Sequence, residues 1–463
     1  MTHTIYPDGL PTPRRYWSMV TIIMVIAMSV LDSTIVNVAL PSIGRDFNAS
    51  PATSIWIING YQIAILIAIV PLASLGEIVG YRRISQTGLV VFTVASFACT
   101  FSHTLLELSI ARVVQGLGAA GMMSVNAALV RFTYPSKMLG RAIGINALVV
   151  ATSAAVGPTL GSAVLAIADW RWLFAINVPI GIVAASIARF SLPYTERTQR
   201  PLNYAGVLLH VATFGLLIAG LQSLAHEEAK LASLLQIGAA CVFGVLLVRH
   251  ELYRKAPLLP FDLLRIPIFS LSLATSVCSF FAQMAAFVAL PFEIQRLGRS
   301  AVETGLLMTP WPVAIAFAAP IAGRLADRYP AGILGGFGLI ALSTGLALLA
   351  AFPENGTAVD LMWRMALCGL GFGFFQAPNN RTMISAAPRN RSGAAGGMLS
   401  TVRLLGQTLG AAIVAVLFRT QMERGAKIAL VAAAVMALVA AIFSFSRLRA
   451  PQPAAASPPP EVM

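Results

Sequence analysis

Residues 30–41 read VLDSTIVNVALP and place a carboxylate, Asp32, inside an otherwise apolar stretch. The stretch ends a run from Tyr16 to Pro41 that is long enough to cross a bilayer as a helix. A charged side chain at the centre of a bilayer costs roughly 2.5 to 3.5 kcal/mol, so an acid there is usually retained for a function. Asp32 is therefore the first candidate functional residue.

The whole chain has the composition of a polytopic membrane protein. Of its 463 residues 57% are hydrophobic and only 11% are charged, and apolar runs of membrane-spanning length recur from end to end. These runs predict an all-α fold of fourteen transmembrane helices, over residues 16–41, 52–76, 84–101, 105–131, 140–166, 170–193, 204–222, 231–248, 268–293, 301–325, 333–351, 359–384, 392–418 and 427–446.

Three sequence echoes predict that the chain is an internal duplication. GEIVGYRR (76–83) is echoed by GRLADRYP (323–330), and GLG and TLG each recur about 250 residues later. Two six-helix halves, residues 1–203 and 249–446, would then flank an inserted transmembrane hairpin at 204–248, with a disordered cytoplasmic tail at 447–463. Paired halves of this kind place a substrate site at their interface near the bilayer midplane.

The loops predict the orientation of the chain. With the N-terminus in the cytoplasm, twenty-one lysines and arginines fall in cytoplasmic segments and eight in external ones, while Arg112, Arg364 and Arg403 lie within helices. Both termini are therefore expected in the cytoplasm. The net charge of +14 reflects these loops and not a nucleic-acid surface, because no basic segment is interleaved with exposed aromatic residues.

Several function classes lack the residues they need. The chain has no GxxxxGK[ST] motif for nucleotide phosphates, so a gradient or a partner subunit must supply any energy. No nucleophile–base pair and no metal-ligand spacing is present, and all four cysteines fall in apolar segments. We expect no enzyme activity, no cofactor, no metal and no disulfide.

Five motifs give the chain a family resemblance. It resembles the fourteen-helix drug:proton antiporters of the major facilitator superfamily, including exporters of methyl viologen and quaternary ammonium biocides, in the motifs LDSTIVNVALP (31–41), GEIVGYRR (76–83), ARVVQGLGAAG (111–121), GPTLG (157–161) and WRWLFAINVPIG (170–181). The resemblance implies proton coupling through Asp32 and Arg112. It also implies a bacterial inner-membrane location. Asp32 and Arg112 are expected at similar depth, where they would pair directly or through water.

The resemblance assigns two further groups of residues. A gating loop is implied at Glu77, Arg82, Arg83, Asp327 and Arg328, and an antiporter helix motif at Gly157, Pro158 and Gly161. The loop departs from the family pattern at Ala73, Glu77, Ile78 and Pro330, and the helix motif at Ser153 and Ser162. Structural explanations stay open: Asp32 as a hydrogen-bond acceptor, Arg112 as a clamp, the loop as a solvated turn and GPTLG as ordinary helix packing.

Aromatic residues near the predicted interface suggest a cavity for flat cations. Candidate lining residues are Tyr61, Phe281, Trp311 and Phe375, although most aromatic residues in a membrane protein belong to the core or the lipid belt.

We therefore predict an exporter of lipophilic, mainly monovalent cations that works by alternating access and exchanges each cation for a proton. Its partners would be those cations, protons and membrane lipid, without nucleic acid or an obligatory protein. Proton and cation would compete for the Asp32 carboxylate. One alternative is an exporter of an amphipathic metabolite or antibiotic, and a second is a membrane sensor that transports nothing.

Overall fold

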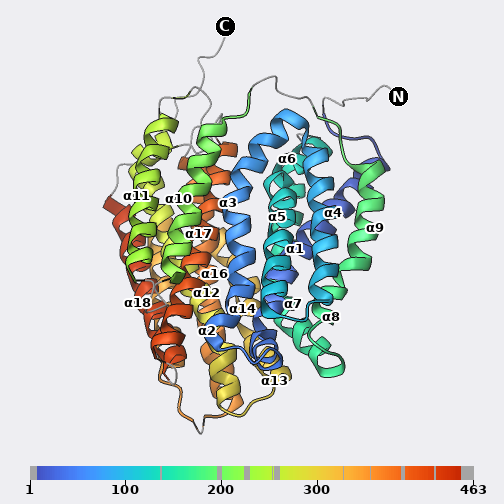
Figure 1. Cartoon of the computed structure of the whole chain (residues 1–463). Coiled ribbons are helices and arrows are strands. Elements are labelled where there is room, and N and C mark those ends of the chain that lie inside the picture. The colour runs from blue at the N-terminus through green and yellow to red at the C-terminus, as the bar shows by residue number, and fades with distance from the viewer. Residues whose placement is uncertain are drawn as a thin grey trace.

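The computed structural model describes residues 8–135, 138–195, 201–223, 230–252, 254, 261–326, 328–354, 356–386, 392–421 and 424–449. Every regular element in these ranges is a helix, as the sequence predicts. The predicted residue Asp327 and the tail beyond Arg449 lie outside the described residues. Figure 1 shows the helices as one bundle, with α2, α8 and α13 near one end and α6 near the other.

The described residues of the first part of the bundle, up to residue 195, contain nine helices with three short breaks inside apolar runs. Its helices are α1 (Arg14–Asp46), α2 (Pro51–Ser54), α3 (Trp56–Val79), α4 (Tyr81–Thr100), α5 (Leu105–Ser124), α6 (Asn126–Thr133), α7 (Leu139–Ile167), α8 (Trp172–Ala175) and α9 (Asn177–Ser191). The breaks at Ile55, Val125 and Ile176 were not predicted, because hydropathy does not change across them.

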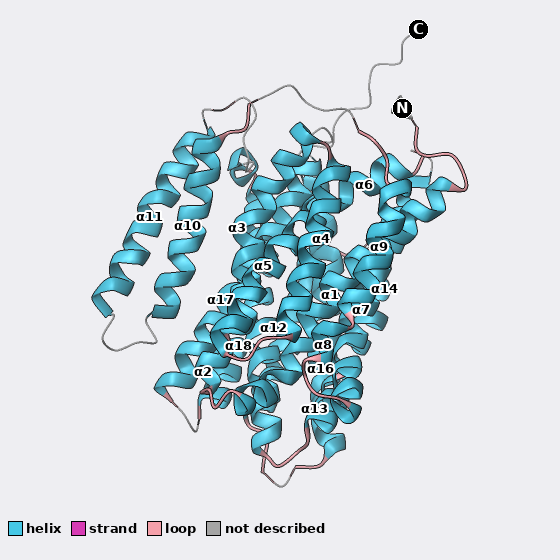
Figure 2. Ribbon diagram, turned by 45° about the vertical axis from the view of Figure 1, so that its right-hand side comes forward, coloured by secondary structure: helices cyan, strands magenta, loops and turns pink. Residues whose placement is uncertain are grey.

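A helical hairpin and seven further α-helices follow. The hairpin is α10 (Tyr204–Ser223) and α11 (Lys230–Leu252), and Figure 2 shows it at one edge of the bundle. The second part contains η3 (Phe261–Arg265), α12 (Pro267–Arg296), α13 (Ala301–Met308), α14 (Pro310–Leu325), α15 (Ala331–Ala350), α16 (Ala358–Ala386), α17 (Ser392–Thr420), α18 (Gly425–Ser446) and the short η5 (Arg447–Arg449).

Twelve helical segments in the described ranges are long and apolar enough to cross a membrane. The predicted count of fourteen is therefore not confirmed. Two predicted spans are not among these twelve: α4, whose first turn contains Arg82 and Arg83 and which carries several hydroxyl side chains, and α7, of which this comparison covers only Thr152–Ile167. Both helices lie where the sequence predicts a span.

The two parts of the bundle repeat one packing pattern. The pairs α1–α7, α3–α5 and α4–α9 in the first part match α12–α17, α14–α16 and α15–α18 in the second. Glycine crossings repeat as well: a Cβ on Gly88 would lie 2.7 Å from the Gly118 carbonyl oxygen, and one on Gly338 would lie 2.6 Å from that of Gly371. Such close approach needs glycine. We infer a division into two halves around the α10–α11 hairpin.

Candidate functional site

The Asp32 carboxylate lies in the interior of the first half, on α1, with none of its side chain exposed. It forms an ion pair with Arg112 of α5. Gln115 Nε2 of α5 and Asn177 Nδ2 of α9 each donate a hydrogen bond of 2.9 Å to Asp32 Oδ1. The carboxylate is thus paired with one cation and satisfied by two amides, as a buried charge requires.

Arg112 is held from several directions. Its Nε donates to the Ile57 carbonyl oxygen at 3.2 Å, and its Nη1 donates to Gln115 Oε1 at 2.6 Å. The guanidinium carbon lies 4.0 Å from the centre of the Tyr61 ring, within cation–π range. The Tyr61 hydroxyl in turn donates to the Ser29 carbonyl oxygen at 3.3 Å. These contacts fix the guanidinium against α3 and α1.

Gln115 links the ion pair to α4. Its Nε2 also donates to Ser96 Oγ at 2.8 Å, while the weak Cys99 thiol donor lies 3.8 Å from its Oε1. An amide that gives and accepts in this way can reorganise when the charge on Asp32 changes, because its donor and acceptor serve different partners. We call Asp32, Arg112, Gln115, Asn177, Tyr61 and Ser96 the polar cluster.

The sequence predicts functional roles for Asp32 and Arg112 but not for Gln115, Asn177 or Ser96. A signal for Gln115 existed, because residues three apart on a helix share a face and Gln115 follows Arg112 by three. Asn177 opens α9 directly after the break at Ile176, which hydropathy does not reveal. The question of direct or water-mediated pairing is answered by the geometry: Asp32 and Arg112 touch.

The antiporter helix motif lies between the two halves. A Cβ on Gly157 would clash with Thr34 Oγ1, and one on Gly161 would lie 3.2 Å from the Ile35 carbonyl oxygen, so α7 packs closely on α1. On another side of α7, a Cβ on Gly305 of α13 would lie 2.6 Å from the Pro158 carbonyl oxygen. The motif therefore joins α1 of the first half to α13 of the second.

The described residues of the predicted gating loop lie at the other end of the bundle from α13. Arg82 donates through Nη1 to the Leu192 carbonyl oxygen at 3.1 Å, and also donates to the Arg189 carbonyl oxygen. These carbonyls end α9, where a cation is favourable. Glu77 is half-buried at the end of α3, whereas Arg83 and Arg328 are exposed.

The predicted aromatic cavity residues are divided between two cores. Phe281, Trp311 and Phe375 share one hydrophobic cluster, whereas Tyr61 belongs to another and serves the polar cluster. The Trp311 ring packs against Phe287 at 5.0 Å between centroids. None of the four residues lines any of three pockets at the surface of the described bundle, which lie beside Arg299, Asp46 and Ser343.

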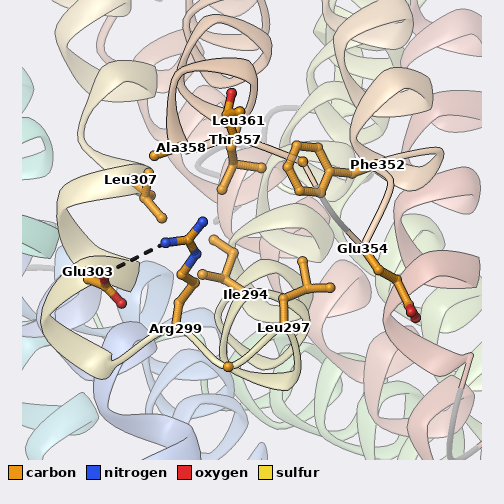
Figure 3. A pocket seen from close by; sticks show the side chains of 12 residues that line it. Ile294, Leu297, Arg299, Glu303, Leu307, Phe352, Glu354, Thr357, Ala358 and Leu361 are labelled. Atoms are coloured by element: carbon orange, nitrogen blue, oxygen red, sulfur yellow. Dashed lines mark ion pairs between the residues drawn. The ribbon is translucent and has the colours of Figure 1, made fainter.

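One of these pockets has charged residues but lies away from the polar cluster. Figure 3 shows it between the ends of α12, α13 and α16, with Arg299 facing Glu303 across 3.9 Å. Its volume is about 250 Å³, and Phe352 and Leu361 contribute apolar walls. Glu303 also caps α13 through Ser300, which gives this carboxylate a structural role.

The comparisons with known proteins agree with this architecture. The model of the Major Facilitator Superfamily matches residues 22–411. The uncharacterized transporter YebQ of Escherichia coli (strain K12) is 49% identical over 97% of this chain and 99% of its own length. Among solved structures, the inward-facing, occupied form of a bacterial homolog of the human lysosomal transporter Spinster superposes with a TM-score of 0.69 at 16% identity, over 95% of this chain and 98% of that one.

Two relatives have names that include a compound. The riboflavin transporter RibZ of Clostridioides difficile (strain 630) is 30% identical over 86% of this chain and 87% of its own length. The methyl viologen resistance protein SmvA of Salmonella typhimurium (strain LT2) is 30% identical over 86% of this chain and 82% of its own. With the family model spanning most of the chain, this protein belongs to the Major Facilitator Superfamily of membrane transporters.

Proposed function

We propose that this transporter exports amphipathic organic molecules in exchange for protons, by alternating access between its two halves. The observation that carries the proposal is the polar cluster, in which the Asp32 carboxylate is wholly buried and is paired with Arg112 inside a membrane bundle. Intramembrane acids of this kind mark proton relays in transporters.

Protonation would change the cluster directly. A neutral Asp32 loses its attraction for the Arg112 guanidinium, and one of its oxygens becomes a donor in place of an acceptor. A proton on Oδ1 would compete with Gln115 and Asn177, which both donate to that oxygen, whereas a proton on Oδ2 would compete with Arg112. Because these residues come from α1, α5 and α9, a proton on Asp32 alters how three helices of the first half are held together.

The contact between the halves supports a gated cycle. α7 meets α13 and α14, and α17 meets α2 and α3, so the halves touch along two lines. Thr159 and Thr309 share a hydrogen bond of 2.5 Å across the first line, near the end of the bundle that carries α13. A conformational change that opens this end must break that contact, and the small residues of the antiporter helix motif allow α7 to slide without large side chains interlocking.

Two substrate classes fit this proposal. The sequence predicts lipophilic, mainly monovalent cations such as quaternary ammonium compounds, and the relative named for methyl viologen resistance supports that class. The alternative is an amphipathic metabolite or antibiotic, and the relative named a riboflavin transporter supports it. Geometry favours the alternative, because the Asp32 carboxylate is fully enclosed by protein donors in this conformation and offers no free oxygen to a cation.

Transport in liposomes tests the proposal. Full-length protein is reconstituted without nucleotide, a pH difference is imposed, and movement of fluorescent amphipathic dyes is followed. We expect flux in the wild type, none that depends on the pH difference in Asp32→Asn, and a partial rate in Asp32→Glu, because only a carboxylate carries the proton. Asp46→Asn is the control, since Asp46 ends the same helix but is about half exposed.

Three results would contradict the proposal. Strict dependence of flux on ATP would remove the proton as the source of energy. Retained pH-driven flux in Asp32→Asn would move the coupling away from Asp32. No flux of any dye by correctly folded wild type would favour the sensor alternative.

A further inference from the structure

The second half carries a cation inside a span that the proposed mechanism does not use. Arg403 lies on α17, eleven residues after Ser392 and seventeen before Thr420, within the first third of the span 398–420. At 1.5 Å per residue it is about 16 Å along the helix from the first of these residues. Intramembrane arginines are rare and normally face a partner or a water-filled cavity.

Two glycines of α17 show which side of this helix packs on α12. A Cβ on Gly406 would lie 2.5 Å from the Val277 carbonyl oxygen, and one on Gly410 would lie 2.6 Å from that of Phe281. Gly157 and Gly161 of α7 have the same spacing and pack on α1, the helix of the first half that matches α12, although at a different height along it. The two helices are therefore equivalent in the repeated packing pattern.

The equivalence also shows which side of α17 meets the other half. On α7 the residues that contact α13 are Pro158 and Ser162, and they correspond to Gln407 and Ala411 on α17, which contacts α2 and α3. With 3.6 residues per turn, Arg403 lies about 40° from the α12 side and about 60° from the α3 side, on the shorter arc between them.

Arg403 therefore lies on the side of α17 that faces both α12 and α3, at the contact between the halves. α1 contacts both α3 and α12, so this contact also borders the helix that carries Asp32. In Figure 1 α17 lies next to α3 and α10, and α10 contacts both of these helices. The corresponding position on α7 is Ala154, so only the second half presents a charge here.

Arg403 lacks a compensating charge in the part of the chain that the structure describes. No carboxylate pairs with it in those ranges, and its Nε is buried without a hydrogen-bond acceptor. Arg112 provides the contrast, because its ion pair, carbonyl and aromatic contacts satisfy the guanidinium. Gln407, one turn further along α17, is half-buried on nearly the same side and adds a neutral polar group.

We propose that Arg403 binds an anionic group of the transported molecule, which makes the substrate an amphipathic compound with a carboxylate or a similar oxyanion. A guanidinium offers paired N–H donors that match an oxyanion, and a partly desolvated one binds it more strongly than in water. This inference rests on the proposed function, because it names the substrate class of that same transporter. A purely cationic molecule would be repelled at this position.

Two dyes that differ only in one carboxylate test the inference. Rhodamine 19 carries a free carboxylate, and rhodamine 6G is its ethyl ester. Binding of each to detergent-solubilised full-length protein is measured by fluorescence anisotropy, which needs no proton gradient. We expect the preference for rhodamine 19 over rhodamine 6G to fall about tenfold or more in Arg403→Gln, and less in Arg403→Lys, as the loss of a charge-assisted contact predicts. Arg449→Gln, which removes an exposed cation, should keep the preference.

A second variant guards against misfolding of Arg403→Gln. In Gln407→Glu the new carboxylate would form an ion pair with the Arg403 guanidinium, one turn away on the same helix. The preference for rhodamine 19 should then fall although Arg403 is retained. An unchanged preference in both variants, or no binding of rhodamine 19 by the wild type, would overturn the inference. Flux in liposomes separates the two proposals. If the wild type shows pH-driven flux but Arg403→Gln keeps the wild-type preference for rhodamine 19, only the role of Arg403 is refuted. If Arg403→Gln loses that preference but the wild type shows no pH-driven flux, only the proposed exchange is refuted.

Discussion

The Asp32–Arg112 ion pair is costly to bury, yet each of its two side chains is needed to compensate the charge of the other. Burying two charges costs several kcal/mol per ion before their attraction is counted, and the pair is stable only because neighbours satisfy the remaining donors and acceptors. Here Gln115, Asn177 and Ile57 do so. Removing one charge alone leaves the other unpaired in the interior, so single and double substitutions should behave very differently.

We predict that Arg112→Gln destabilises the protein by about 3 to 5 kcal/mol, because it strands the Asp32 carboxylate. Asp32→Asn strands a guanidinium that keeps its contacts with Ile57 and Tyr61, and should cost less. The double variant should be more stable than the sum of the two losses predicts. Reversible unfolding in mixed micelles measures all three free energies, with Arg83→Gln as the exposed control. Additive losses would show that the two side chains do not interact.

Sequence alone could reach the charged members of the polar cluster but not the neutral ones. A carboxylate or a guanidinium stands out in an apolar run because of its transfer cost, whereas amides and hydroxyls such as Gln115 and Ser96 are common in membrane helices. Their roles come from which helices meet, and the contact between α1, α5 and α9 is a property of the folded chain. Arg403 was noticed as lying within a helix, but its direction required the packing of Gly406 and Gly410.

At the scale of helices, hydropathy predicted where the helices lie better than it predicted whether each of them is continuous. The predicted run 170–193 is divided into α8 and α9, and the run 105–131 is divided into α5 and α6. Hydropathy could not predict these breaks, because the residues at each break are as apolar as their neighbours. The same measure overlooks α4, whose first turns carry Arg82, Arg83 and Gln86. Its serine and threonine side chains bond to nearby backbone carbonyls, and Gln86 donates to the Ala188 carbonyl oxygen of α9, so polar groups that are satisfied in the fold still lower the hydropathy of a membrane-length segment.

The crossing of α7 and α13 supplies a prediction at this scale. A Cβ on Gly305 would clash with Ser162 Oγ and lie 2.6 Å from the Pro158 carbonyl oxygen, so a larger side chain must separate the two helices. We expect Gly305→Leu to cost about 1 to 3 kcal/mol. It should also lengthen the distance between spin labels at Ile167 and Leu306, two exposed positions on these helices.

Gly323 is the matched control for this measurement, because a Cβ there would meet nothing within 4 Å. Gly323→Leu should leave both the stability and the label distance close to those of the wild type. An unchanged distance in Gly305→Leu would mean that α7 and α13 are not in contact in the membrane, and the gate assigned to the antiporter helix motif would then fail.

For the whole molecule, the sequence echoes and the packing agree at one offset. Tyr61 of α3 and Trp311 of α14 lie 250 residues apart, and their carbonyl oxygens contact Gly116 of α5 and Gly369 of α16, which lie 253 residues apart. Because the halves share one packing pattern, a charged residue that is present in only one of them indicates a role specific to that half. The first half holds the Asp32–Arg112 pair and the second holds Arg403, so the proposed proton site and anion site lie in different halves, which move relative to each other during alternating access.

The orientation of the bundle is a prediction that also decides the number of spans. With both termini in the cytoplasm, the loops rich in arginine face inward, as the positive-inside rule requires. Reporter fusions after Arg254 should then be cytoplasmic, and fusions in the segment 223–230 should be external.

If α4 crosses the membrane, fusions after Gly80 and Ser102 should report opposite sides, with green fluorescent protein active only inside and alkaline phosphatase only outside. If α7 also crosses, fusions after Tyr134 and Asp169 should differ in the same way. Equal signals within either pair would reduce the count below fourteen, and inverted signals throughout would reverse the orientation and with it the direction of transport.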